Sequence, residues 1–136
     1  MTHPITELQG ALVPALLADS ALITALGGDF VFDAPPKGGN RPYVLIARHD
    51  LLPRDGDETP GNEHRLTIEI WHSDASRAKA LALAERVIAV LDAADLDTAG
   101  LMVTHRNAVR TDTAIDTRNG GARASVQYRF FSEPAA

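Results

Sequence analysis

The feature that most constrains the fold is strict alternation between apolar and polar side chains in two segments. In residues 65–72, Leu66, Ile68 and Ile70 lie on one side of an extended chain, and mostly polar residues lie on the other. Residues 122–130 repeat this pattern with alanine, valine and aromatic residues at every second position. A period of two predicts strands with one buried and one exposed face. Such strands suit an antiparallel sheet that is packed on one side only.

Three other segments have the spacing of amphipathic helices instead. These helices are expected over residues 4–19, 20–27 and 73–94. Pro14 falls inside the first helix and should kink or divide it, because proline cannot donate the backbone hydrogen bond of a helix interior. Either Ser73 or Asp74 should cap the third helix.

The remaining strand signals complete the order of elements. The five expected strands cover residues 30–32, 43–48, 65–72, 101–115 and 122–130. The pair Asn119-Gly120 between the last two is typical of a hairpin turn. The order α-α-β-β-β-α-β-β predicts an α+β fold, with an antiparallel sheet of four to five strands and helices packed on one face. We expect residues 1–136 to form a single domain.

Composition excludes several classes of protein. The chain has no cysteine, so it has neither disulfides nor thiolate metal ligands. Its net charge of −5 makes tight binding to nucleic acid a poor expectation, since that affinity comes largely from cations on phosphates. No segment has the roughly 18 consecutive apolar residues of a membrane span, and the N-terminal residues lack the basic region of a signal peptide. We therefore expect synthesis in the cytoplasm and no membrane partner.

No motif for catalysis or for cofactor binding is visible. The histidines have no ligand spacing: His64 and His72 share a strand face, but they stand roughly 26 Å apart. The glycine pairs do not form a phosphate loop, and no serine sits in a nucleophile elbow. We expect no enzyme, no metal and no cofactor. The alternatives are a small cytosolic enzyme or ligand-binding domain with a pocket between sheet and helices, and an adaptor or immunity-type interaction protein.

Residues 49–64, between two expected strands, carry most of the net negative charge. They hold five carboxylates against one arginine. The acids are Asp50, Asp55, Asp57, Glu58 and Glu63. The spacing does not match a calcium-binding loop. The composition predicts a solvated, mobile loop, or a loop kept acidic so that it faces DNA or a partner protein.

Trp71 is out of place on its strand. Alternation puts it on the polar face together with Arg65 and Glu69. A tryptophan in this position is either covered by a loop or helix of its own chain, or buried against another subunit, because tryptophan is enriched at protein interfaces. We take Arg65, Glu69 and Trp71 as the candidate subunit interface.

Four motifs in this order make the chain similar to a known family. They are the short element at residues 22–27, the segments 32–36 and 42–44, and the strand 63–71, which ends in Trp71 directly before the capped helix. With the final hairpin, this order resembles the tail terminator (tail-completion) proteins of long-tailed phages and of alphaproteobacterial gene transfer agents. The resemblance covers nearly the whole chain.

The resemblance implies a structural role in a phage-like tail. Tail terminators form a homo-hexameric ring that ends elongation of the tail tube and joins the tube to the head-side connector or stopper protein. Double-stranded DNA passes through the ring without specific binding. The resemblance also implies that the chain, once made in the cytoplasm, becomes part of the assembled particle, and it supplies no catalytic residue to look for here.

Overall fold

A curved five-stranded sheet is the frame of the molecule. The computed structural model describes residues 2–37, 42–55, 60–118 and 120–135. The strands are β1 (Val31–Phe32), β2 (Tyr43–Asp55), β3 (Pro60–His72), β4 (Leu101–Ile115) and β5 (Ala122–Pro134), in the spatial order β1-β2-β3-β5-β4. All neighbours are antiparallel except β1 and β2. A wholly antiparallel sheet was therefore the wrong expectation at this edge, because residues 33–42 separate β1 from β2 and the two strands are not joined by a tight hairpin turn.

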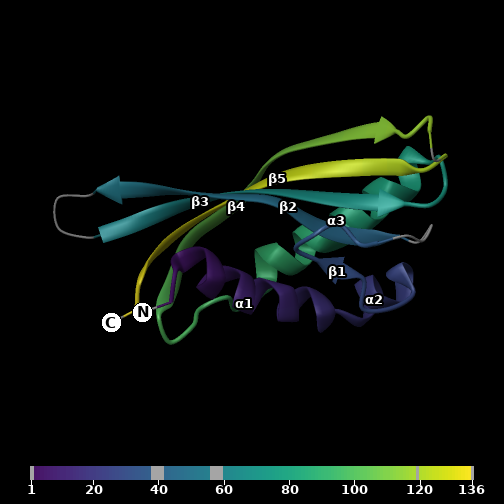
Figure 1. Ribbon diagram of the computed structural model, residues 1–136. Helices are drawn as coiled ribbons and strands as arrows, with labels where there is room; N and C mark the ends of the chain where they lie inside the picture. The colour runs from purple at the N-terminus through teal and green to yellow at the C-terminus, as the bar shows by residue number, and fades with distance from the viewer. Residues whose placement is uncertain (1, 38–41, 56–59, 119, 136) are drawn as a thin grey trace.

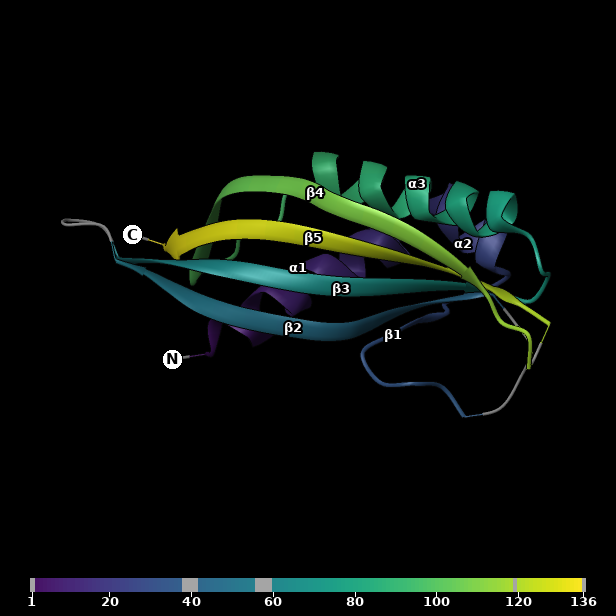
Figure 2. The same cartoon turned by 90° about the horizontal axis from the view of Figure 1, so that it is seen from above.

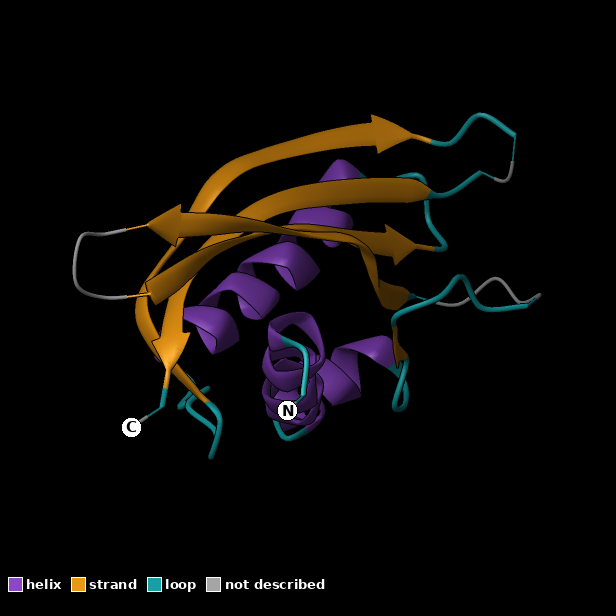
Figure 3. Cartoon of the chain, turned by 60° about the vertical axis from the view of Figure 1, so that its left-hand side comes forward, coloured by secondary structure: helices purple, strands orange, loops and turns teal. Residues whose placement is uncertain are grey.

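Three helices cover one face of this sheet. They are α1 (Pro4–Leu17), α2 (Ser20–Leu26) and α3 (Arg77–Ala93), and the sheet curves around them (Figures 1 and 3). The predicted order of elements and the α+β class are confirmed. The core lies between the two layers, where the alternating residues Leu66, Ile68 and Ile70 of β3 are at most 1% exposed. Tyr128 and Phe130 of β5 join them.

Two helix details differ from the prediction. α1 continues unbroken past Pro14, because the bond that proline cannot make lies on the exposed side, toward Gly10, where water can satisfy the carbonyl. α3 begins later than expected, at Arg77, and its cap is Ser76, whose hydroxyl accepts from the Lys79 amide. Asp74 pairs with Lys79 instead, and His72 Nδ1 accepts from the Asp74 amide.

Asp19 joins two of the helices. Its side chain caps α2 by accepting from the Leu22 amide at 3.0 Å, and it receives both Nε and Nη2 of Arg86 from α3. The hydrogen bond from Arg86 is the main reason that the pKa of Asp19 is lowered. We expect Asp19→Ala to lower the free energy of unfolding by about 1 kcal/mol, the usual cost of a lost N-cap. Urea denaturation at neutral pH, with Asp29→Ala as an exposed control, measures this loss.

The expected mobile loop at residues 49–64 is not a loop in the described residues. β2 and β3 stay paired from Tyr43↔Trp71 out to Asp55↔Pro60. We call residues 49–55 and 60–64 the hairpin arm, which reaches past the helices in Figures 1 and 2. The loop prediction was wrong because continued backbone pairing, together with burial of His64 among neighbouring strands, outweighs the polar composition. Residues 56–59, with Asp57 and Glu58, lie outside the described residues.

β4 contains two irregularities that change which way its side chains point. The register shifts between Val103 and His105 and again between Ala108 and Arg110. The first shift turns Arg106 to the helix side, where its Nη1 donates to the Leu91 and Ala94 carbonyls at 2.9 and 2.6 Å. Strict alternation from the buried Leu101 would have put Arg106 on the open face and His105 on the helix side. An arginine at this place satisfies the last carbonyls of α3.

In the described part of the chain, no single helix is long and apolar enough to cross a membrane. Together α1 and α2 have that length and composition, but the chain bends by 76° between them. Their apolar residues Leu8, Leu12 and Leu22 are buried completely in the core of the subunit.

Candidate interaction surface

The sheet face without helices, here called the open face, carries the three residues predicted as a subunit interface. Arg65, Glu69 and Trp71 alternate on β3 with the buried Leu66, Ile68 and Ile70, so they point away from the core. Arg65 is exposed, and Glu69 and Trp71 are partly buried. The prediction of a shared face therefore agrees with the geometry. That the face is an interface stays a prediction.

Trp71 is one member of an aromatic row that crosses the open face at one end of the sheet. Its ring stacks on Tyr43 with centroids 6.1 Å apart, Tyr43 meets Phe32 edge-on at 6.1 Å, and Phe32 stacks near Phe30 at 6.5 Å. The indole Nε1–H donates to Glu69 Oε1 at 3.1 Å. Burial, and then the Glu69 carboxylate, raise the pKa of Tyr43. The row could not be predicted from the sequence, because its members come from β1, β2, β3 and the residue before β1.

A hollow of about 450 Å³ lies further along the open face, and residues of both signs of charge line it, among them Arg48, Asp50 and Glu63. Asp50 accepts from Arg48 Nε at 2.9 Å, and Glu63 accepts from Arg65 Nε at 2.6 Å. Asp50 and Glu63, which were expected in an acidic loop, are thus paired with neighbouring arginines and lie on strands. The side chains of the other predicted acids, Asp55, Asp57 and Glu58, lie outside the described residues.

At the other end of the open face, Phe131 of β5 is surrounded by cations. The guanidinium carbon of Arg54 lies 3.9 Å from the centre of its ring, and that of Arg129 lies 5.2 Å away. His105 packs against the same ring at 5.2 Å. Such stacked arginines keep hydrogen-bonding capacity toward a partner, and arginine and aromatic residues are enriched at protein interfaces.

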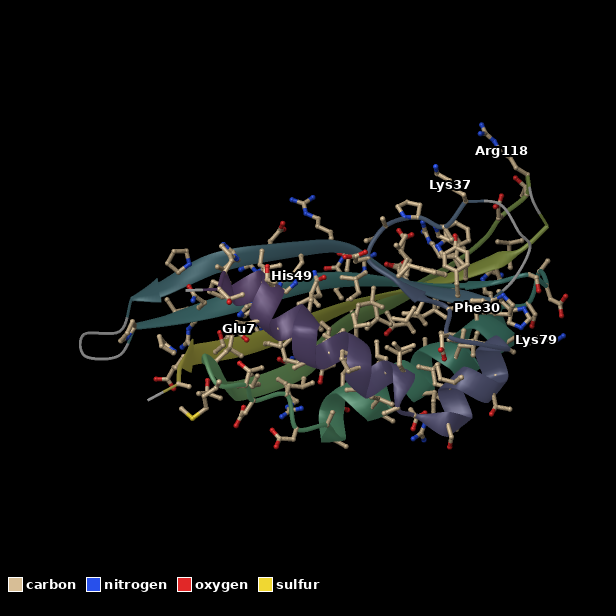
Figure 4. The ribbon with its side chains drawn as sticks, turned by 60° about the horizontal axis from the view of Figure 1, so that its bottom comes forward. Glu7, Phe30, Lys37, His49, Lys79 and Arg118 are labelled. Carbon is tan, nitrogen blue, oxygen red and sulfur yellow. The ribbon has the colours of Figure 1, made fainter. Side chains whose placement is uncertain are left out.

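A chain of hydrogen bonds on the helix side was not predicted. Gln9 Nε2 lies 3.1 Å from His49 Nδ1, His49 Nε2 lies 2.8 Å from His64 Nδ1, and His64 Nε2 lies 2.8 Å from Ser132 Oγ. Figure 4 shows His49 alongside α1. We call these four residues the histidine chain. Its members are far apart in sequence, and only recognition of the long hairpin would have placed His49 near His64, as diagonal neighbours across the two strands.

The histidine chain has the connectivity of a nucleophile and base, but not their properties. Ser132 is only 2% exposed, so a substrate has little access to its hydroxyl. Burial, and for His49 also the neighbouring His64, lowers the pKa of both rings to about 4, which makes each a weak base. A second histidine also replaces the carboxylate that would stabilise an imidazolium. Within the described residues no group of three or more His, Asp or Glu side chains could hold a metal ion.

The alternative of a pocket between sheet and helices gains no support from the packing. Leu12, Leu16, Ile68, Val87 and Val126 are 0% exposed in that layer. Two hollows among the described residues lie elsewhere: one on the open face, and one of about 320 Å³ near the start of α1 and the end of β5.

Fold and surface together define a class of protein: a small α+β subunit whose sheet buries one face under helices and leaves the other open, aromatic and charged. Residues 10–133 match the family described as tail completion protein gp17, and the chain belongs to that family. It is therefore a structural protein of the phage-tail type.

A solved structure agrees with this assignment. The chain is similar to one in the virion of a native gene transfer agent particle, with 28% sequence identity and a TM-score of 0.77. The match covers 97% of this chain and 99% of that one. Among curated proteins, none matches the sequence.

Proposed function

We propose that this protein forms a hexameric ring that ends elongation of a phage-like tail tube and joins the tube to the head-side connector or stopper protein. Membership of the tail completion family is the observation that carries this proposal. The similarity to a chain of a gene transfer agent virion supports it. On this proposal the subunit is made in the cytoplasm, acts without catalysis or cofactor, and ends as part of the tail.

The open face is the proposed site of contact between subunits. A ring closes when one surface of each subunit meets a different surface of the next, and this contact repeats by rotation. The aromatic row supplies a rigid apolar anchor at Trp71, and the neighbouring Arg65 and Glu69 supply charges that can set the register of the contact. Aromatic anchors inside a polar rim are the usual anatomy of such interfaces.

The acidic residues of the hairpin arm are proposed to face the DNA channel or a partner protein. Asp50 and Glu63 lie on the open side of the arm, and Asp55, Asp57 and Glu58 belong to its outer end by sequence. Carboxylates beside DNA do not bind phosphates, so the double strand can pass through the ring without being held.

The test is to measure what the purified protein builds. We expect native mass spectrometry to find a hexamer at high protein concentration or with tail tubes, and electron microscopy to show rings capping one end of each tube. Tubes assembled with the protein should have one narrow length distribution, and tubes without it should continue to grow. Tubes that grow equally long in both cases would contradict termination, and a stable dimer with tubes uncapped would contradict the ring.

A further inference from the structure

The histidine chain joins the hairpin arm to two other parts of the fold. Gln9 belongs to α1, His49 to β2, His64 to β3 and Ser132 to β5, and the three bonds between them measure 3.1, 2.8 and 2.8 Å. His49 and His64 are the first residues on each side of the arm, next to the main body of the sheet. The histidine chain therefore links the base of the hairpin arm to the helix layer through polar contacts.

With Gln9 Nε2 facing His49, the donors and acceptors leave one consistent arrangement of protons. The Gln9 amide nitrogen can only donate, so His49 Nδ1 accepts and His49 Nε2 carries the proton. That proton is donated to His64 Nδ1, and His64 Nε2–H is in turn donated to Ser132 Oγ. Both rings must be neutral for all three bonds to exist together.

A second proton on either ring breaks the chain. It would enter at Nδ1, where the incoming group is already an N–H, so two donors would face each other at hydrogen-bond distance. The charge would also sit at a site where His64 is 0% exposed. We propose that the histidine chain is an acid-released latch, which holds the base of the hairpin arm against α1 and frees both when the surroundings become acidic.

The charged groups around the chain do not remove this sensitivity. His3, the N-cap residue of α1, opposes protonation of both rings, and Glu7 of α1 lines the hollow next to Ser132. From β2, Asp50 favours the charged form of His49, but its carboxylate is paired with Arg48 on the open face. From β3, Glu63 is paired with Arg65, and from β5, Glu133 lies in the hollow beside Ser132. Burial is the largest influence on each ring and lowers the pKa of each to about 4.

The direction of the pH effect follows from this lowered pKa. An opened arm exposes histidines of ordinary pKa 6.5, which bind protons more readily than the latched rings. Opening therefore takes up protons, and the latch is lost as pH falls from about 6.5 toward about 4. Protonation of one ring alone should raise the equilibrium constant for opening by roughly 70-fold between pH 7.5 and pH 4.5.

Hydrogen exchange of the intact protein, followed by mass spectrometry, tests the latch. After correction for intrinsic exchange rates, peptides from α1 and from the hairpin arm should lose protection at about pH 4.5 relative to about pH 7.5. Peptides from the β4–β5 turn should not. A uniform loss over the whole chain, or no loss in the arm, would overturn the proposal.

Two variants and one direct measurement complete the test. His64→Gln and His49→Gln keep a neutral polar group and should remove most of the acid response, whereas His105→Gln, on the open face, should keep it. Should both chain variants fail to fold, nitrogen NMR of the wild-type rings decides the question. Titration of either buried ring near its ordinary pKa of 6.5 would contradict a latch. The latch is a property of the single subunit. The latch proposal can therefore fail while the ring proposal holds, and the ring proposal can fail while the latch proposal holds.

Discussion

Trp71→Ala should yield a folded subunit that no longer closes into rings or caps tail tubes. The residue lies on the open face, so its loss leaves no cavity among Leu66, Ile68 and Ile70. It would remove the anchor of the aromatic row, at a cost of about 2 kcal/mol or more in each joint. Because the same contact recurs around a closed ring, one substitution weakens every joint together. Circular dichroism checks the fold, and native mass spectrometry with electron microscopy checks assembly.

The structure supplies matched controls for this result. Leu81→Ala removes a partly exposed apolar side chain from α3, on the opposite layer, and should assemble normally. Trp71→Phe keeps a ring that can stack on Tyr43 but loses the hydrogen bond to Glu69, so it should assemble more weakly than the wild type. If Trp71→Ala unfolds, Trp71 belongs to the subunit's own core, and the face assigned to a partner is covered from within. If the variant assembles as well as Leu81→Ala does, Trp71 does not anchor the joint.

Two truncations of the hairpin arm should differ sharply in their effect on folding. Replacing residues 54–61 by a short turn removes only the outer end, and it should change the free energy of unfolding by less than about 1 kcal/mol. Replacing residues 49–64 also removes His49 and His64, leaving Gln9 and the buried Ser132 without their partners. That change should cost about 3 kcal/mol or more.

Chemical denaturation of both variants at neutral pH gives the comparison. If the shorter truncation already causes a loss as large as that of the longer one, the stabilising contacts lie in the outer end of the arm and not at the histidine chain.

Patterns confined to one element could be predicted from the sequence. The alternation around Ile68 and the helical spacing around Val87 gave the right element types, order and buried faces. Errors arose where a contact between distant segments overrides local composition. The acidic hairpin arm contains Asp, Gly and Pro typical of loops, yet it forms strands because each strand supplies the other with a partner. The bulge before His105, which redirects Arg106, has no signal in a single sequence.

The same distinction between local patterns and long-range contacts applies to the candidate site. Arg65, Glu69 and Trp71 were placed on the correct face, because one strand's alternation is sufficient for that. The row from Phe30 to Trp71 depends on the pairing of three strands, and the histidine chain depends on four elements. Neither can be derived until the sheet order is known.

A sheet that is packed on one side lets core and contact surface change independently over evolution. Neighbouring positions on β5, such as Val126 and Gln127, point to opposite sides of the sheet. The residue at the first must fit the core, and the residue at the second contacts solvent or a partner. Substitutions at the outward positions can alter charge and shape without leaving a void inside. A lineage could therefore exchange one set of neighbours for another through alternate residues of the same strands, while the hidden half of each strand kept the subunit intact.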